Sequence, residues 1–459
     1  MAGTSSISGL ASGFDSASVI AGLMEIEALP QAQLSTKLTA AQSKANAYRS
    51  LNSSFDALLT AAKALTTAST WNAAKATSSS STVAATAGST AQTGSISFTV
   101  DRLATTHART TAEKWTTTTE ATTLGTTLTL GTGASITLDG NGDGSTTLAE
   151  AVTAINAAGK GIKAAAVNTG SGYVLQLTAT STGAAAAFTA TSGSATFNLT
   201  AQGQDAQLTI GSDTATTAAY TVTSSSNTFS EVLAGTTFTV SSAGTAATIT
   251  VDSDPEAITA SVQALVDAAS SVLTMIGTYT AKDTDYGVLS SDYSIKQLKN
   301  SIIETVNTAV GSTSLSSSGL SVDRYGSINF DADAFTAALA ADPAAVQAAF
   351  QGSTQVGSDN IADTVDDKIG TDGLAARLQL LTARVTDSVN GTLTTLSDGM
   401  DARADDLQDQ IDAWTLRLAQ REETLTAKFT AMESALSTLS NQASWLTSQL
   451  GNLPSWSDE

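Results

Sequence analysis

The sequence predicts a multidomain α+β protein, in which long amphipathic helices from both chain ends form a coiled coil or bundle and β-rich domains are inserted in the middle. Apolar residues recur every three or four positions near both ends, which is the period of a helix. The middle is rich in Thr, Ser, Ala and Gly, and its apolar residues alternate as they do in strands. The length of 459 residues also exceeds the ~250 at which a single core stops growing.

The amino-terminal helical pattern covers residues from about 15 to 70. Asp15 or Ser16 is the predicted N-cap, since both side chains can accept a hydrogen bond from the first helical turn. Pro30 is predicted to begin a second helix, because proline is tolerated best at the first helical position. The apolar stripe that follows comprises Leu34, Leu38, Ala41, Ala45, Tyr48, Leu51, Phe55, Leu58, Ala62 and Leu65.

Residues from about 77 to 254 have the alternation of antiparallel sheets. Clear strands are "SISFTV" at 95–100, "GYVLQLTAT" at 172–180 and "GTTFTV" at 235–240. One helix interrupts them at "TLAEAVTAINAAG", which ends at Gly159. The middle is therefore predicted to hold two small β-rich domains.

Helical patterns return after Asp254 and Pro255, an N-cap followed by proline in the first turn. A second helix is predicted in "SIKQLKNSIIETVNTAV", and "GSINFDADAFTAALAADPAAVQAAF" reads as a short strand followed by two short helices. The chain ends in its strongest helical period, which would span on the order of 85 Å as one helix. Its apolar positions are Leu393, Leu396, Met400, Leu407, Ile411, Trp414, Leu418, Leu425, Phe429, Met432, Leu436, Leu439, Ala443, Leu446 and Leu450.

These patterns divide the chain into five predicted parts. Residues 1–45 are assigned to the amino-terminal leg helices and residues 393–459 to the carboxy-terminal leg helix. Residues 46–76 and 255–392 together are assigned to a helical bundle. Residues 77–115 and 200–254 together are assigned to a β-rich core domain, and residues 116–199 to an inserted β/α domain. The long apolar stripes of the two legs need a partner, either each other or neighbouring subunits.

The charge balance excludes two classes of partner. The chain has 21 basic and 42 acidic residues, and its net charge of −21 repels nucleic acid and anionic membranes. No stretch reaches the ~20 consecutive apolar residues of a membrane span.

The absence of cysteine excludes disulfides and cysteine-based metal sites. The start of the chain lacks the basic and apolar regions of a secretory signal, so we expect export, if any, without a cleaved signal peptide.

The sequence gives no support for catalysis. Its one histidine, His107, follows a predicted strand without any nucleophile motif, and we predict a surface position at the strand end. No phosphate-binding glycine loop is present. We therefore predict a protein that is not an enzyme.

The segment "DGNGDGSTTLAE" at 139–150 has two interpretations. One is a Ca²⁺ site, with ligands from Asp139, Asn141, Asp143, the Ser145 carbonyl and Glu150. The other is a hairpin-type turn followed by a capping box, in which Thr147 and Glu150 start the next helix. The strand-like residues before the loop favour the capping box, and no other cofactor is expected.

Several segments resemble the flagellar filament cap proteins, also called hook-associated protein 2. "SGLASGFDSASVIAGLMEIEALPQAQL" is similar to the opening of that family, and "LTAKFTAMESALSTLSNQASWL" resembles its last helix. "TTLAEAVTAINAAGKGIKAAAVNTGSGYVLQLTATSTGAA" resembles an insertion shared by cap proteins and flagellins. The most specific match is "GLSVDRYGSINFDADAFTAALAADPAAVQAAF". The resemblance covers nearly the whole chain and is weakest between about 111 and 135.

This resemblance implies an extracellular protein at the distal tip of the bacterial flagellum, exported by the type III route. It implies a homo-oligomeric ring, commonly pentameric, whose β domains form a plate and whose helical ends reach into the filament. Flagellin, the hook–filament junction protein and a cytoplasmic export chaperone are the implied partners. On this basis we predict an assembly surface formed by Leu23, Met24, Leu436, Leu439, Leu446 and Leu450.

Two other functions remain open from sequence alone. Flagellins and hook–filament junction proteins are also helical at both ends with β insertions, although the 326–350 block is foreign to them. A secreted calcium-binding surface adhesin is suggested by the Thr-rich middle and the 139–150 loop.

Overall fold

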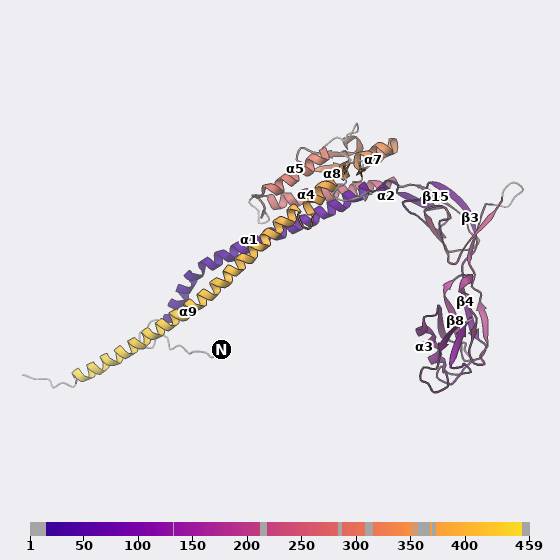
Figure 1. Cartoon of the computed structure of the whole chain (residues 1–459), viewed down its shortest axis with the longest axis horizontal. Helices are drawn as coiled ribbons and strands as arrows, with labels where there is room; N and C mark the ends of the chain where they lie inside the picture. The colour runs from indigo at the N-terminus through magenta and orange to yellow at the C-terminus, as the bar shows by residue number, and fades with distance from the viewer. Residues whose placement is uncertain are drawn as a thin grey trace, which may run out of the picture. The chain divides into compact units, whose positions relative to one another are not determined.

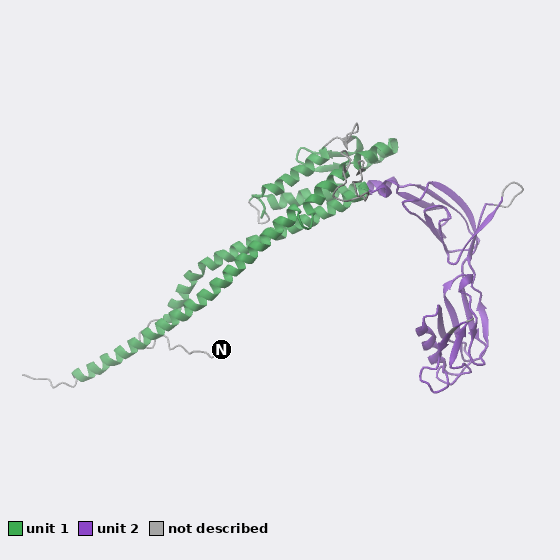
Figure 2. Ribbon diagram, viewed as in Figure 1, with its two compact units in different colours: residues 1–66, 261–459 green, residues 67–260 purple. Residues whose placement is uncertain are grey.

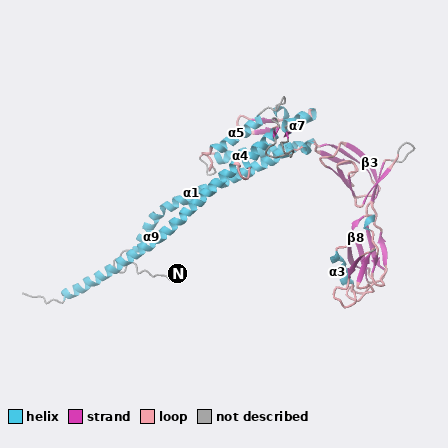
Figure 3. Cartoon of the chain, viewed as in Figure 1, coloured by secondary structure: helices cyan, strands magenta, loops and turns pink. Residues whose placement is uncertain are grey.

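The computed structural model describes residues 15–131, 133–211, 218–282, 287–307, 315–351, 354–355, 368–369 and 373–451. The chain divides into two compact units (Figure 2). Unit 1 combines residues 1–66 with 261–459, and unit 2 comprises 67–260, so the second unit is an insertion into the first. Unit 1 is mainly helical and unit 2 is mainly strand (Figure 3).

Two long helices pair side by side in unit 1 (Figure 1). Helix α1 spans Ser16–Thr66, and helix α9 spans Thr392–Gly451, a length of about 90 Å at 1.5 Å per residue. Asp15 caps α1, since its Oδ1 accepts the Ser18 N–H at 3.1 Å. The predicted stripe is buried from Ala41 to Leu65 of α1.

The predicted helix break at Pro30 is wrong, because α1 continues through it. Proline removes one helical hydrogen bond, and its ring crowds the preceding turn. Contacts with α9 hold α1 on both sides of this position. Glu27 pairs with Arg421 at 3.0 Å, and Gln31 donates to the Thr415 hydroxyl at 2.7 Å. The partner helix therefore outweighs the local preference for a break.

The rest of unit 1 is a helical bundle with two small two-stranded sheets. The predicted strand followed by two short helices is confirmed as β17 (Ile328–Phe330), α6 (Ala332–Ala341) and α7 (Pro343–Gln351). Phe335 of α6 meets Phe350 of α7 edge to face, with ring centroids 5.7 Å apart. The bundle elements are α4 (Pro255–Thr280), α5 (Tyr293–Asn307), η2 (Leu315–Ser318), β16 (Leu320–Val322), β17 (Ile328–Phe330), α6 (Ala332–Ala341), α7 (Pro343–Gln351), β18 (Thr354–Gln355), β19 (Lys368–Ile369) and α8 (Leu374–Thr386).

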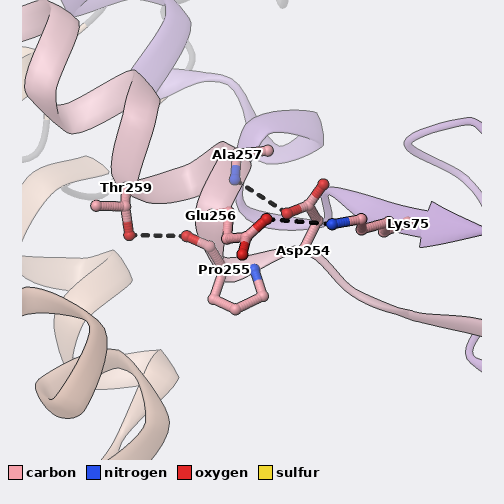
Figure 4. Close-up of polar contacts among 6 residues, drawn as sticks. All are labelled: Lys75, Asp254, Pro255, Glu256, Ala257 and Thr259. Atoms are coloured by element: carbon pink, nitrogen blue, oxygen red, sulfur yellow. Dashed lines mark hydrogen bonds and ion pairs between the residues drawn. The ribbon is translucent and has the colours of Figure 1, made fainter. Parts of the chain in front are cut away.

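Helix α4 begins as the sequence predicts. Asp254 Oδ1 accepts the Ala257 N–H at 3.0 Å, and Pro255 occupies the first helical position (Figure 4). Glu256 in the same turn pairs with Lys75 at 3.1 Å, and this hydrogen bond raises the pKa of Lys75. By length and composition α4 is the one described helix that could cross a membrane, with a mean hydropathy of 1.3. A core helix passes the same test, and α4 buries an apolar stripe from Val262 to Ile276.

Unit 2 begins with a β-rich domain that follows α2 (Ala68–Trp71). Its five-stranded antiparallel sheet has the order β1 (Ala74–Ser78), β15 (Ala246–Ser253), β3 (Gly94–Arg102), β11 (Ala206–Ile210) and β12 (Tyr220–Ser224). A three-stranded sheet has the order β13 (Thr228–Ser230), β14 (Thr236–Val240) and β2 (Val83–Ala87). The rings of Phe98, Phe229 and Phe238 join the two sheets, with Phe98 stacked on Phe238 at 5.0 Å.

The second part of unit 2 also combines two sheets. Its four-stranded sheet has the order β10 (Phe197–Ala201), β4 (Thr106–Thr111), β8 (Tyr173–Thr182) and β7 (Ile162–Asn168). The three-stranded sheet is β6 (Ala134–Thr137), β5 (Thr127–Leu130) and β9 (Ala190–Thr191), and η1 (Ala184–Ala186) follows β8. Helix α3 (Leu148–Ala158) packs Leu148, Ala151 and Ile155 into a shared core.

A two-stranded ribbon connects the two parts of unit 2. Strand β3 leads into β4 through residues 103–105, and β10 leads into β11 through 202–205. These connections are themselves hydrogen-bonded, since the Thr105 N–H donates to the Gln204 carbonyl at 3.0 Å. The ribbon thus passes from one large sheet into the other with its pairing maintained.

Candidate assembly surface

Polar contacts fix the antiparallel register of α1 and α9. Glu27 with Arg421 and Gln31 with Thr415 lie in the outer part of the pair. An ion pair of Arg49 and Asp401 lies nearer the bundle. Because these side chains are exposed, each ion pair contributes little to stability, and their effect is mainly on register.

The apolar contact between the two helices becomes smaller toward the carboxy-terminal end of α9. Ala41, Ala404 and Leu407 form its buried cluster, with Leu34 and Leu38 packed against it. The farthest described contact joins the Ser16 hydroxyl to Glu433 Oε1 at 3.5 Å, at the first residue of α1. Residues 434–451 of α9 therefore extend past the described part of α1.

Four of the predicted surface residues lie on this extension. Leu436, Leu439, Leu446 and Leu450 are 36%, 59%, 56% and 61% exposed. Trp445 is 62% exposed on the same segment and was missed by the sequence reasoning, although its place beside Leu446 could have indicated it. Exposed large apolar residues at this density are typical of surfaces that bind another protein, and the assembly surface at these residues stays a prediction.

The structure separates the two predicted residues of α1. Met24 is half-buried and shares a helix face with Gln31, which bonds to α9. Leu23 is turned about 100° from Met24, as successive residues of a helix are, and is 40% exposed. Ile26 and Leu29 are 65% and 56% exposed and were also missed. Of the two predictions, Leu23 is the residue available to a partner.

The 139–150 loop connects β6 to α3, so it leads into a helix and is not a hairpin turn. The capping box is confirmed: Thr147 Oγ1 accepts the Glu150 N–H, and Glu150 Oε2 accepts the Thr147 N–H at 2.9 Å. Glu150 Oε1 accepts from Asn141 Nδ2 at 2.6 Å. The second carboxylate oxygen is therefore bonded as well.

The other carboxylates of the loop bond to the loop itself. Asp139 accepts the N–H groups of Gly142 and Gly144 at 2.7 and 2.9 Å. Hydrogen bonds from Ser145 lower the pKa of Asp143. Among the described residues no group of three or more His, Asp or Glu side chains is arranged to hold a metal ion. These oxygens stabilise the turn, and the Ca²⁺ site stays a prediction.

The predicted surface position of His107 is wrong, because the side chain is only 2% exposed within β4. Its Nδ1 accepts the Gly203 N–H at 3.4 Å, and its Nε2 lies 3.0 Å from the Phe188 carbonyl oxygen. Arg109 Nε donates to the same carbonyl at 2.8 Å. His107 thus lies buried beside the two-stranded ribbon, where it contacts Gly203 and Phe188 and has a structural role.

Comparison with known proteins identifies the family. A model described as the flagellar hook-associated protein 2 C-terminus matches residues 203–441, and one described as its N-terminus matches 12–107. The first covers slightly more than half of the chain. The chain belongs to the flagellar hook-associated protein 2 family. The helical ends and the β middle are thus those of a hook-associated protein 2.

The chain is also similar to individual proteins over parts of its length. The lateral flagellar hook-associated protein 2 of Vibrio parahaemolyticus is 26% identical over 236 residues, which cover 47% of this chain and about half, 52%, of the relative. The flagellar cap protein FliD of Escherichia coli, solved as domains D1–D3, shares the fold with a TM-score of 0.58 at 23% identity, over 78% of this chain and all of that one. FliD of Pseudomonas aeruginosa matches 44% of this chain at 22% identity, with a TM-score of 0.35.

Proposed function

We propose that this chain caps the flagellar filament and that the exposed apolar end of α9 is its contact with the assembly. The single observation that carries the proposal is the run of Leu436, Leu439, Trp445, Leu446 and Leu450, which lies past the described start of α1 on a hook-associated protein 2 fold. Leu23, Ile26 and Leu29 of α1 provide a second apolar group on the same helical pair.

The proposed mechanism is steric and interfacial. A ring of copies at the distal tip holds its β domains over the channel exit, and the helical ends engage the open sites of the filament. Exported flagellin subunits fold beneath the ring and add one at a time. This requires a surface that binds and releases, and apolar side chains on a solvated helix bury a modest area per contact.

The partners follow from this location. They are further copies of the chain, flagellin, the hook–filament junction protein and a cytoplasmic export chaperone. The export itself is proposed to leave the amino terminus uncleaved. The chain would act outside the cell, without membrane insertion or nucleic acid, and without enzymatic chemistry.

The first test combines substitution with localisation. Immunogold labelling of the unchanged chain should place gold at the distal tips of flagella. Leu439→Asp with Leu446→Asp should abolish tip labelling and cause unpolymerised flagellin to leak into the medium. Leu416→Asp is the matched control, since Leu416 is 62% exposed on α9 but lies within the part paired with α1.

Each alternative has its own outcome. Gold along the filament would mean flagellin, gold at the hook would mean a junction protein, and gold on the cell body would mean an adhesin. If the double variant still capped filaments, the α9 end would not be the contact, even with gold at the tips.

A further inference from the structure

Basic residues are concentrated in one stretch of α1. Between Ala28 and Phe55 the helix carries three basic residues and no acidic one, in a chain of net charge −21. Arg49 pairs with Asp401 of α9. The side chains of the other two, Lys37 and Lys44, have no hydrogen bond or ion pair with any residue in the described part of the chain. This stretch therefore keeps a positive charge that the described residues do not neutralise.

The two lysines line a pair of adjoining grooves. One groove, of about 350 Å³, lies between α1 and α9 and is lined by both lysines and by Arg403 of α9. The other, of about 420 Å³, lies between α1 and Val288. Both contain Ala40 and Lys44, so they adjoin, and we call them together the cationic groove. The other α1 residues that line it are small, namely Thr36, Thr39, Ala41 and Ser43.

Arg403 adds a third cation to this groove. Its side chain has no hydrogen bond or ion pair with the residues that the structure describes. Two nearby carboxylates of α9 are engaged elsewhere, since Asp401 pairs with Arg49 and Asp406 accepts from Gln410 at 3.0 Å. Asp405 is turned about 200° from Arg403 around the helix, away from the groove. Positive charge from both helices thus meets in one hollow.

The spacing of the lysines favours a helical ligand. Lys37 and Lys44 are seven residues apart on one face of α1, about 10.5 Å along its axis. A helix that lies along α1 presents its own residues seven apart at the same spacing and on one face. In a strand this distance corresponds to about three residues, whose side chains point to opposite faces. The small side chains of the groove also allow a second helix to approach closely.

We infer that the cationic groove binds an acidic helical segment of a partner protein. Two carboxylates seven residues apart on that segment pair with Lys37 and Lys44, and a carboxylate on the neighbouring turn reaches Arg403. Lys44 is half-buried, where salt screens its charge less than in open solvent. The rest of the chain is strongly acidic and repels such a segment, so opposite charge directs it to this one groove.

This inference goes beyond filament capping and does not depend on it. The groove lies where α1 and α9 are paired, and it contains none of the exposed apolar residues at the end of α9. The two proposals therefore fail separately. Loss of tip labelling contradicts capping alone, and failure of an acidic helix to bind contradicts this inference alone.

The test measures binding of a fluorescent peptide to the full chain by anisotropy. The probe is an alanine-rich helical peptide of about 20 residues, long enough to form a helix, with glutamates seven residues apart on one face. The control peptide has the same composition, with its glutamates spread around the helix. We expect the first peptide to bind about tenfold more tightly than the second, and to weaken when the salt concentration rises from about 0.05 to about 0.5 M.

Lys37→Glu with Lys44→Glu should weaken binding of the first peptide at least tenfold. The matched control is Arg417→Glu with Lys428→Glu, which makes the same change in charge at two exposed positions of α9 outside the groove. It should bind nearly as the unchanged chain does. Ala40→Phe fills the groove without altering its charge, and it should weaken binding about fivefold. Unchanged far-UV circular dichroism spectra would show that each variant is folded.

Three results would overturn the inference. Equal binding of the two peptides, or equal loss in the control variant, would mean a general attraction between charges. Binding of anionic vesicles or duplex DNA as tight as that of the first peptide would mean the same. Self-association of the unchanged chain in the ultracentrifuge, removed by Lys37→Glu with Lys44→Glu and without peptide binding, would make a second copy the occupant.

Discussion

At the scale of single residues, His107 shows how a polar ring can hold two parts of a unit together. His107→Leu leaves the Gly203 N–H without its acceptor in a buried position, while the Phe188 carbonyl keeps its bond from Arg109. We expect unit 2 to lose about 1–3 kcal/mol of unfolding free energy, the usual cost of an unsatisfied buried donor. Urea unfolding followed by far-UV circular dichroism measures this loss.

A conservative variant supplies the control for His107. In His107→Asn the amide oxygen can take the place of Nδ1, and we expect part of the stability to return. Equal stability of the leucine variant and the unchanged chain would show that the Gly203 contact contributes nothing.

Glu150 separates the two interpretations of the 139–150 loop. Glu150→Gln keeps a capping box, because glutamine also serves at that position, whereas Glu150→Ala loses it. We expect the alanine variant to lose about 1 kcal/mol and the glutamine variant to stay within about 0.5 kcal/mol of the unchanged chain in chemical unfolding. Since both carboxylate oxygens are already bonded, we also expect calorimetry in chelator-treated buffer to show no Ca²⁺ binding down to millimolar affinity. Binding by the unchanged chain that Glu150→Gln abolishes would establish the calcium site instead.

At the scale of elements, Pro30 is the point where the structure overrides local sequence. Pro30→Ala restores a backbone N–H inside α1 and removes the clash of the ring with the preceding turn. We expect unit 1 to gain up to about 3 kcal/mol, seen as a higher melting temperature in far-UV circular dichroism. Gly22→Ala is the control, because an added Cβ there meets no atom within 4 Å and should contribute only about 1 kcal/mol. A gain at Pro30 no larger than at Gly22 would mean that α1 is already strained or frayed there.

What the sequence predicts correctly at this scale depends on neighbours along the chain. The caps at Asp15, Asp254 and Thr147 each bond to a residue three positions away, and all three were predicted. The errors depend on distant residues. His107 is buried by Phe188 and Gly203, which are 81 and 96 positions away, and α1 is held beside Pro30 by residues some 384 positions away. Nothing in a local pattern encodes such contacts.

The prediction of the candidate surface shows the same difference between local patterns and contacts with distant residues. The period of α9 predicted an apolar stripe, and it identified Leu436, Leu439, Leu446 and Leu450. Period alone could not show where α1 begins beside α9, and therefore could not distinguish the paired Leu407 from the exposed Leu439. For the same reason Met24 and Leu23 were predicted together, although only one of them faces solvent.

At the scale of the whole molecule, the insertion of unit 2 into unit 1 predicts that residues 67–260 fold alone. The ends of this segment are brought together by the pairing of β1 with β15, in which Ala74 lies opposite Ser253. Its two cores are formed by residues of the segment itself, including the stacked Phe98 and Phe238. Neither core contains a residue of α1 or α9, so their removal exposes no part of these two clusters.

The expected result is a soluble β-rich fragment with a cooperative thermal transition. Its melting temperature should lie within a few degrees of the β transition of the full chain, since the cores are unchanged. A fragment of 77–254 is the matched control: it lacks most of β1, and because that edge strand pairs with β15 along its length it should melt at a lower temperature. If the longer fragment failed to fold, unit 2 would depend on the helical unit for its stability, and the two units would fold together rather than separately.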